Sequence, residues 1–330
     1  MNQQIINLRA FAIIMVVLGH SIIIYDNTFD LLTSDVKMPM FETLKHYISF
    51  IQMKLFISIS GFLLAYRCMK ESQIWGGKKY INYLNKKVYR LLIPYIFVCL
   101  FWSNPIKIIL GIPEFELDYK ILLQQLIGNN CGHLWYLPCL FILIALGYPV
   151  FCWAGKNLTK HTILFALLLT LNYYHTKLPE VFQLKNVAYY FIFFHLGFIV
   201  NLLRTTKLEY IPKYQNKLHS VCILIIVSIV GYSIRCVTSI GFECYLSIVI
   251  TLLLYVLMPS FRNNILDEIS NRSYGLYLFH SPLIYITATL CPNINPWFML
   301  IINFIVLGVI AYFITMWLSN SKLKFIIGQL

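Results

Sequence analysis

The sequence predicts an all-α polytopic membrane protein with about ten transmembrane helices, and three observations lead to this fold class. Hydrophobic residues make up 59% of the 330 residues, and the mean hydropathy is +0.72. Charged residues make up 12%, which is about half the share of roughly 25% in soluble domains. The apolar residues fall in runs of about 20, the length that a helix needs to cross a bilayer. Soluble and intrinsically disordered classes are excluded, because both need more polar sequence.

The predicted spans divide the chain into one helical membrane domain, residues 1–330. No internal repeat or low-complexity segment is visible, and no linker is long enough to separate soluble domains. The ten predicted spans are, in chain order, 5–25, 47–66, 88–109, 134–153, 161–176, 187–203, 219–239, 243–260, 273–290 and 297–319.

The basic residues between the spans predict the orientation of the chain. Of the 26 Lys and Arg residues, 17 lie in or at the edge of the gaps after the even-numbered spans and in the C-terminal tail, whereas 7 lie in or near the edge of the other gaps. Cytoplasmic loops of membrane proteins carry such an excess of Lys and Arg. The asymmetry therefore predicts cytoplasmic N- and C-termini, which require an even number of spans.

The net charge of +13 and the 16% of aromatic residues raise the question of nucleic-acid binding. The aromatic residues lie within the apolar runs, however, and most Lys and Arg residues lie between them. We therefore assign the basic excess to membrane loops and expect no nucleic-acid partner. The nine cysteines are scattered without a CxxC pair, and no His, Cys, Asp and Glu cluster has the spacing of metal ligands. No metal site is predicted.

Two polar residues in the first span, Arg9 and His20, are candidates for function, because ionisable groups inside a membrane are costly. Their separation of eleven residues is close to three helical turns, so both project from one helix face, roughly 16 Å apart along the axis. A guanidinium suits a phosphate-bearing cofactor, and an imidazole suits proton abstraction from a hydroxyl. The alternative is an interfacial Arg and a His bonded to a backbone carbonyl.

These residues and four further segments resemble the acyltransferase-3 family of integral membrane acyltransferases. Arg9 and His20 match the signature of the family's first span. The other matching segments follow in the expected order and are LFISISGFLLAY (55–66), KKVYRLLIPY (86–95), HLWYLPCLF (133–141) and SYGLYLFHSPL (273–283). The resemblance covers essentially the whole chain.

At two places the sequence departs from the family pattern. The family's basic-x-x-Arg pair often begins with Arg, whereas this chain has Lys87 followed by Arg90. Lysine keeps the charge but lacks bidentate phosphate geometry. Members that act on capsular or nodulation sugars often read His-Met-Pro before the Ser-Gly segment, where this chain has a lysine, Lys54, as the third residue.

The resemblance implies a division of labour between two substrates. An acyl group, usually acetyl from acetyl-CoA, is taken from the cytoplasm and reaches a sugar hydroxyl of an envelope glycan or its lipid-linked precursor. His20 matches the family's essential histidine, and Arg9 matches its arginine associated with acyl-CoA. Arg90 and Lys87 are the further candidates for cofactor binding. A bacterial inner membrane is the expected location.

Candidates for the acceptor site are His133, Trp135 and Lys54. The order of spans places His133 and His20 toward the same, non-cytoplasmic side. Trp135 can stack on a sugar ring, although tryptophans also populate interfacial belts without a ligand. Lys54 needs a partner within its span, and the available ones are Glu42, Asp26 or a backbone carbonyl.

Two more histidines lie near the middle of spans. We expect His280, in a matching segment, to have a structural or site role, and His195 to be a bonded core histidine. The overall prediction is a membrane O-acetyltransferase of surface polysaccharide. A transporter or flippase for a lipid-linked sugar, with Arg9, Lys54 and His20 lining its path, is the alternative from another class.

Overall fold

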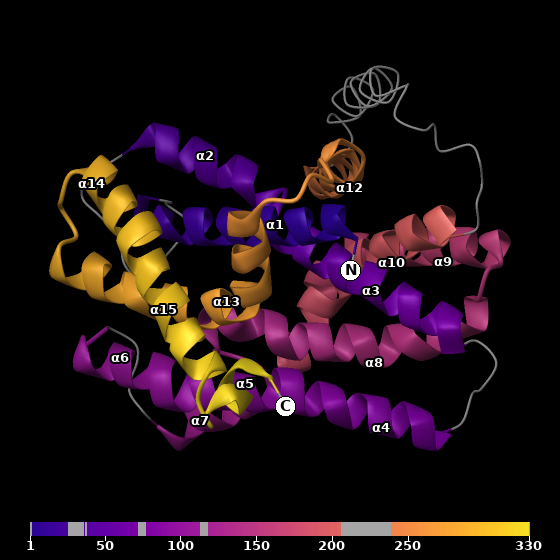
Figure 1. The fold of residues 1–330 in the computed structure, drawn as a ribbon, viewed down its shortest axis with the longest axis horizontal. Coiled ribbons are helices and arrows are strands. Elements are labelled where there is room, and N and C mark those ends of the chain that lie inside the picture. The colour runs from indigo at the N-terminus through magenta and orange to yellow at the C-terminus, as the bar shows by residue number, and fades with distance from the viewer. Residues whose placement is uncertain are drawn as a thin grey trace.

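The fold consists of helices throughout the part of the chain that is described. The computed structural model describes residues 2–25, 36, 38–71, 77–112, 118–205 and 239–329. Every regular element in these ranges is a helix, and none is a strand (Figure 1). The predicted all-α class is therefore confirmed for these residues.

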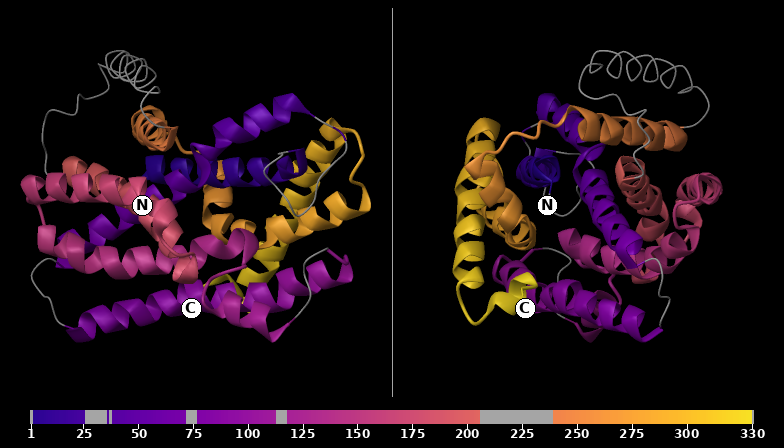
Figure 2. Two further views of the ribbon diagram at one scale, coloured as in Figure 1. Left: turned by 180° about the vertical axis from the view of Figure 1, so that it is seen from behind. Right: turned by 45° about the vertical axis from the view of Figure 1, so that its right-hand side comes forward.

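Helix α1 (Gln3–Ser21) lies between α3 (Gln52–Glu71) and α13 (Asn264–Leu290), as Figure 2 shows. It begins where the Asn2 side chain accepts a hydrogen bond from the backbone N–H of Gln4, because this bond satisfies one of the free amides of the first turn. The helix that follows is mostly apolar and contains a single charged residue. α1 therefore carries its few polar groups into apolar surroundings.

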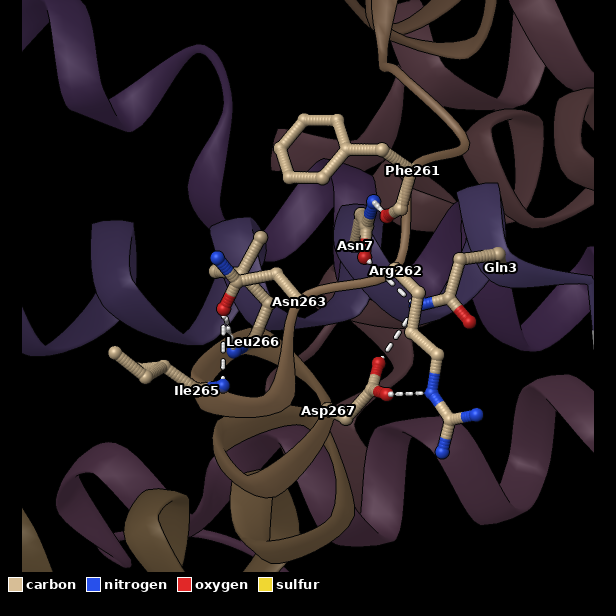
Figure 3. Close-up of polar contacts among 8 residues, drawn as sticks. All are labelled: Gln3, Asn7, Phe261, Arg262, Asn263, Ile265, Leu266 and Asp267. Atoms are coloured by element: carbon tan, nitrogen blue, oxygen red, sulfur yellow. Dashed lines mark hydrogen bonds and ion pairs between the residues drawn. The ribbon is translucent and has the colours of Figure 1, made fainter.

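The start of α1 is tied to the start of α13 by side-chain contacts (Figure 3). Gln3 Nε2 donates to Asp267 Oδ1 at 2.6 Å, and Asn7 Nδ2 donates to the carbonyl oxygen of Phe261 at 3.0 Å. The other carboxylate oxygen of Asp267 lies 3.4 Å from Nε of Arg262. These contacts fix the relative position of the two helices that carry most of the candidate site.

Helix α3 packs closely against α10 (Leu184–Thr205) at two glycines. A Cβ atom added to Gly61 would lie 1.8 Å from the carbonyl oxygen of Phe194, and one added to Gly197 would lie 1.8 Å from that of Ser58. Only glycine permits such an approach, and small residues commonly mediate contacts between membrane helices. Gly61 and Gly197 therefore allow close packing of the two helices.

Residues 77–109 form one continuous helix that is widened by two π-helical turns. Its successive segments are α4 (Gly77–Lys87), the π turn Val88–Leu92, α5 (Ile93–Val98), the π turn Cys99–Ser103 and α6 (Asn104–Ile109). Pro94 and Pro105 each follow a π turn closely, and a proline lacks the N–H that a regular helix requires. The first π turn carries Arg90.

The remaining helices surround these elements, and α1, α8 and α4 lie at three successive levels of Figure 1. A short 3₁₀ turn, Gly132–Trp135, directly precedes α8. Another, Lys324–Ile327, lies close to the end of the described chain. The other helices are α2 (Pro39–Ser49), α7 (Tyr119–Leu126), α8 (Tyr136–Ala154), α9 (Leu158–Tyr173), α12 (Ser239–Leu257), α14 (Pro296–Ile301) and α15 (Leu307–Ser319).

Among the described residues, six helices are long and apolar enough to cross a membrane. They are Gln3–Ser21, Pro39–Met69, Gly77–Ile109, Gly132–Ala154, Val181–Thr205 and Pro296–Ser319. These helices indicate an integral membrane protein.

The other four predicted spans are not among these six helices. The apolar part of α12, Gly241–Leu257, is shorter, and α9 has 16 residues. In α13, serine, tyrosine and histidine residues interrupt the apolar sequence. The predicted span 219–239 lies outside the described residues apart from its last position.

Candidate functional site

A cavity of about 840 Å³ lies beside the first half of α1 and is lined by four basic side chains. They are Arg9 of α1, Arg67 of α3, Lys87 at the end of α4 and Arg90 of the following π turn. None of the described residues that line it is Asp or Glu. We call this space the basic cavity. Its volume is within the range of small-molecule sites.

Neighbouring side chains hold the cationic groups of the basic cavity. Arg9 Nε donates to Ser270 Oγ of α13 at 2.9 Å. The Arg67 guanidinium lies 4.1 Å from the ring centroid of Tyr83, and Lys87 Nζ lies 5.4 Å from the same ring. The ring of Tyr83 therefore makes cation–π contacts with both cations, and these contacts are favourable.

The π turn that carries Arg90 is held from two sides. The backbone carbonyl of Arg90 accepts a hydrogen bond from the hydroxyl of Tyr274 at 2.7 Å. Gly328, at φ +67°, approaches so closely that an added Cβ atom would lie 2.6 Å from the same carbonyl oxygen. The Arg90 side chain remains exposed. It is thus attached to a fixed backbone and can still reach a ligand.

The structure brings the three predicted cofactor-binding residues, Arg9, Lys87 and Arg90, into one cavity and adds Arg67. In the sequence, Arg67 is one of the 17 basic residues assigned to the cytoplasmic side. The sequence did indicate this position of Arg67. Arg67 follows Ser60 by seven residues, which is close to two helical turns, so the two residues share one face of α3. Both residues line the basic cavity.

A second polar region, the histidine cluster, lies near the other end of α1 and consists of His20, His280 and His133. The ring centroids of His20 and His280 are 5.0 Å apart, and those of His280 and His133 are 5.8 Å apart, with edge-to-face geometry in both pairs. His280 of α13 thus links His20 of α1 with His133 of the 3₁₀ turn before α8. The sequence placed His20 and His133 on the same side, and the structure joins them through His280.

The hydrogen bonds of His20 determine which of its nitrogens is basic. Its Nδ1 lies 2.8 Å from the carbonyl oxygen of Val16 and 3.3 Å from His280 Nε2. A carbonyl only accepts, so Nδ1 carries the hydrogen and Nε2 has the free electron pair of the neutral ring. The expected alternative, a bond to a backbone carbonyl, therefore holds for Nδ1 and leaves Nε2 available as a base.

His280 repeats this arrangement on α13. Its Nδ1 lies 2.8 Å from the carbonyl oxygen of Leu276, so Nδ1–H is donated there. Its Nε2 is an acceptor that shares the Nδ1–H of His20 with the nearer carbonyl of Val16. His280 is 1% exposed. It can therefore orient the His20 ring without itself reaching a substrate.

His133 has one satisfied nitrogen and one that lacks a partner. Nε2 lies 3.2 Å from the carbonyl oxygen of Leu278 and donates to it, which leaves Nδ1 as an acceptor. Among the described residues, Nδ1 has no hydrogen-bond partner although it is buried. The hydroxyl of Tyr277 donates to the His133 carbonyl and holds the turn in place. An orphaned buried acceptor of this kind suits a hydroxyl donor.

A line of polar aromatic residues joins the basic cavity to the histidine cluster. Ser60 lines the cavity, and its Oγ lies 3.4 Å from the hydroxyl of Tyr136. The ring centroid of Tyr136 is 5.3 Å from that of Tyr277, which in turn is 5.8 Å from that of His133. The two regions are therefore connected through adjacent side chains.

Trp135 and Lys54, the other two residues predicted for the acceptor site, are not part of the histidine cluster. Trp135 is half-buried and stacks on Tyr190, with ring centroids 5.0 Å apart, so one face of the indole is already covered. Lys54 is 5% exposed, and its Nζ donates to the carbonyl oxygen of Ser49 at 3.0 Å. Of the partners predicted for Lys54, the backbone carbonyl is confirmed, and Asp26 lies outside the described residues.

Lys54 has aromatic and acidic neighbours as well. Its Nζ is 5.5 Å from the ring centroids of Phe50 and Tyr189, and the charge of Glu243 acts on it.

His195 is fully buried, and its Nε2 lies 3.0 Å from Nδ1 of His161. This is the environment expected of a bonded core histidine.

The fold and the two polar regions define a helical membrane protein with a cationic cavity at one end of a central helix and a basic imidazole near the other. A protein-family model described as an acyltransferase domain matches residues 2–320. The chain therefore belongs to the acyltransferase-3 family, as its resemblance indicated, and is a membrane acyltransferase. No curated protein and no solved structure matches it.

Proposed function

We propose that the chain is a single-domain O-acetyltransferase with ten spans and cytoplasmic termini in a bacterial inner membrane. It transfers an acetyl group from cytoplasmic acetyl-CoA to a sugar hydroxyl of a surface polysaccharide or its lipid-linked precursor. The observation that carries the proposal is the presence of both halves of the site on α1, with Arg9 in the basic cavity and His20 in the histidine cluster.

The basic cavity suits the phosphate groups of CoA. Guanidinium groups bind phosphate oxygens through paired hydrogen bonds, and lysine adds a point charge. Arg9, Arg67 and Arg90 supply the guanidinium groups, and Lys87 supplies the ammonium. The apolar part of the lining, from α3 and α8, suits the less polar arm that carries the thioester.

The histidine cluster supplies the base for transfer. His20 Nε2 removes the proton of the acceptor hydroxyl while the oxygen of that hydroxyl attacks the thioester carbonyl carbon. A carbon–oxygen bond forms and the carbon–sulfur bond breaks, and the departing thiolate of CoA takes up a proton from His20. His280 acts as a positioning residue, because its Nε2 accepts from the nitrogen that is not used in the reaction.

The transporter alternative requires Arg9, Lys54 and His20 to line one path. Lys54 instead contacts Ser49, Phe50 and Tyr189 and does not line the basic cavity. The geometry therefore favours the acyltransferase.

Acyl transfer by the purified protein in lipid nanodiscs tests the proposal. With radiolabelled acetyl-CoA and an oligosaccharide mixture from a bacterial envelope, the wild type is expected to release CoA and label the saccharide. His20→Ala is expected to retain acetyl-CoA binding but to release no CoA. Movement of lipid-linked saccharide without CoA release would instead establish the transporter.

A further inference from the structure

Two buried lysines flank the histidine cluster in the same way, one on each side. An added Cβ atom at Gly19 would lie 3.5 Å from Lys45 Nζ, and one at Gly132 would lie 3.8 Å from Lys107 Nζ. Gly19 directly precedes His20, and Gly132 directly precedes His133. Each ammonium group therefore lies beside the backbone that carries one of these histidines.

These lysines come from elements that are distant from each other in the sequence. Lys45 belongs to α2 and is 9% exposed, and Lys107 belongs to α6 and is 5% exposed. Burial of an ammonium group is costly, and two of them beside one cluster concentrate positive charge at this end of α1. Both lysines also interact with other groups of the protein.

The surroundings of the histidine cluster are cationic. The charge of Lys45 acts on His20, and the charge of Lys107 acts on His133, whereas no carboxylate of the described residues is among the groups that act on these two histidines. The one acidic residue of α2, Glu42, is exposed. Two fixed positive charges thus accompany a base and an orphaned hydrogen-bond acceptor.

Other polar atoms face the same region. A Cβ atom at Gly19 would lie 2.6 Å from Oε1 of Gln52, which is buried and has no hydrogen-bond partner among the described residues. A Cβ atom at Gly132 would lie 3.6 Å from the hydroxyl of Tyr285. Together with Nδ1 of His133, these groups offer hydrogen bonds to sugar hydroxyls next to the two ammonium groups.

We infer that the histidine-cluster end binds an acceptor that carries an anionic group, with Lys45 and Lys107 as its ligands. This inference rests on the proposed acyltransferase function and names the chemical class of its acceptor. The anionic group is a carboxylate or a phosphate, since an ammonium binds either one. A carboxylate would belong to the saccharide itself as a uronate, and a phosphate would belong to the lipid link of a precursor.

Three acceptors distinguish the two sources of negative charge. The first is a neutral glucose disaccharide, the second is the same disaccharide with one hydroxymethyl group oxidised to a carboxylate, and the third is the neutral disaccharide attached to a polyprenyl pyrophosphate. Each is offered to the wild type in nanodiscs with labelled acetyl-CoA. We expect at least one anionic acceptor to have a KM about tenfold or more below that of the neutral disaccharide.

Charge-removing variants then test the two lysines. Lys45→Gln and Lys107→Gln are each expected to raise the KM for the preferred anionic acceptor about ten- to hundredfold, the usual effect of losing a charged hydrogen bond. Their KM for the neutral disaccharide and their affinity for acetyl-CoA should stay within about twofold of the wild type. Lys45→Arg keeps the charge and should restore most of the preference.

Lys120→Gln is the matched control. Lys120 is an exposed lysine of α7 in a loop predicted on the same side, and this variant should leave all three KM values unchanged. Acetyl-CoA affinity also reports whether each variant is folded.

Two results would overturn the inference in different ways. If the wild type used all three acceptors equally, or if both lysine variants changed the neutral and anionic KM values alike, the acceptor would not be selected by charge, and the acyltransferase proposal would stand. If the wild type did not bind acetyl-CoA, or released no CoA even with the envelope oligosaccharide mixture, the proposed function would fail and this inference with it.

Discussion

The basic cavity and the histidine cluster are the two polar regions on α1, and they differ in the kind of polarity that they bring into an apolar bundle. The cavity contains three guanidinium groups and one ammonium, which stay charged and can attract phosphate. The cluster contains three imidazoles that are each bonded to a backbone carbonyl, and two of them, His20 and His280, are also bonded to each other. Fixed charge serves binding, whereas a neutral imidazole with a free nitrogen serves proton transfer.

The contacts that hold the polar side chains in place also differ between the two regions. The cations of the cavity come from α1, α3 and the helix of residues 77–109, and the ring of Tyr83 lies beside two of them, Arg67 and Lys87. Each of His20 and His280 donates to the carbonyl four residues earlier on its own helix, which fixes the ring orientation locally. Under the proposed function, one region holds the donor and the other acts on the acceptor, so substitutions at the two ends should have different kinetic effects.

The largest effect is expected for His20→Ala. Loss of a general base lowers a rate by about 10²–10⁴-fold, so acetyl transfer should nearly disappear. The amount of protein in the membrane and its affinity for acetyl-CoA should stay near the wild-type values, because the basic cavity is untouched. A variant that still modifies saccharide at nearly the wild-type rate would show that the proton acceptor is another group.

The next effect is expected at the cavity. Arg9→Lys keeps the charge but loses the paired hydrogen bonds of the guanidinium, so the Kd for acetyl-CoA should rise about tenfold or more. The KM for the acceptor should not change. Isothermal titration with CoA, together with acceptor kinetics at saturating donor, measures both quantities. A change in acceptor KM alone would place Arg9 at the wrong end.

Replacement of His280 should have a smaller effect. His280→Gln removes the ring nitrogen that accepts from His20, and loss of one neutral hydrogen bond predicts a decrease in kcat of about five- to tenfold. Since His20 would remain as the base, the pH profile of kcat should shift and its shape should persist. An unchanged kcat with only a lower melting temperature would assign His280 a purely structural role.

The smallest effect is expected for Trp135→Ala. One face of the indole packs on Tyr190, so only the remaining surface can contact a sugar. We expect the acceptor KM to rise about threefold, the scale of a single aromatic contact, while acetyl-CoA affinity stays constant. Loss of protein from the membrane without a change in KM would indicate a packing residue.

The sequence predicted the parts of this arrangement that depend on a single helix. The shared face of Arg9 and His20 follows from helical periodicity, and Lys87 and Arg90 belong to a segment, residues 86–95, that resembles one of the family's. The structure places all four in the two expected polar regions. The close approach at Gly61 also followed from residue type, because a glycine in an apolar helix commonly marks a packing contact.

Other parts depend on lateral packing between distant helices, which periodicity does not encode. His20 and His280 are 260 residues apart and meet only because α1 and α13 pack together. Arg67, Lys45 and Lys107 read as loop charges in the sequence, and their burial or their place in a cavity appears only in the folded chain. The π turns of residues 77–109 were also not predicted, because hydrophobic periodicity does not distinguish a π turn from a regular helical turn.

The central claim, that donor and acceptor enter at opposite ends of α1, is tested most directly by acetyl transfer in sealed vesicles. The orientation of the protein is determined with the variant Lys79→Cys, whose exposed position lies on α4. The variant is labelled with a membrane-impermeant thiol reagent, and the labelling of the wild type is subtracted. Acetyl-CoA is then added only on the side from which residue 79 is reached, and the acceptor saccharide only on the other. Our account predicts acetylated saccharide in this arrangement and none when the two substrates are exchanged. Product formed only when both substrates share one side would contradict it.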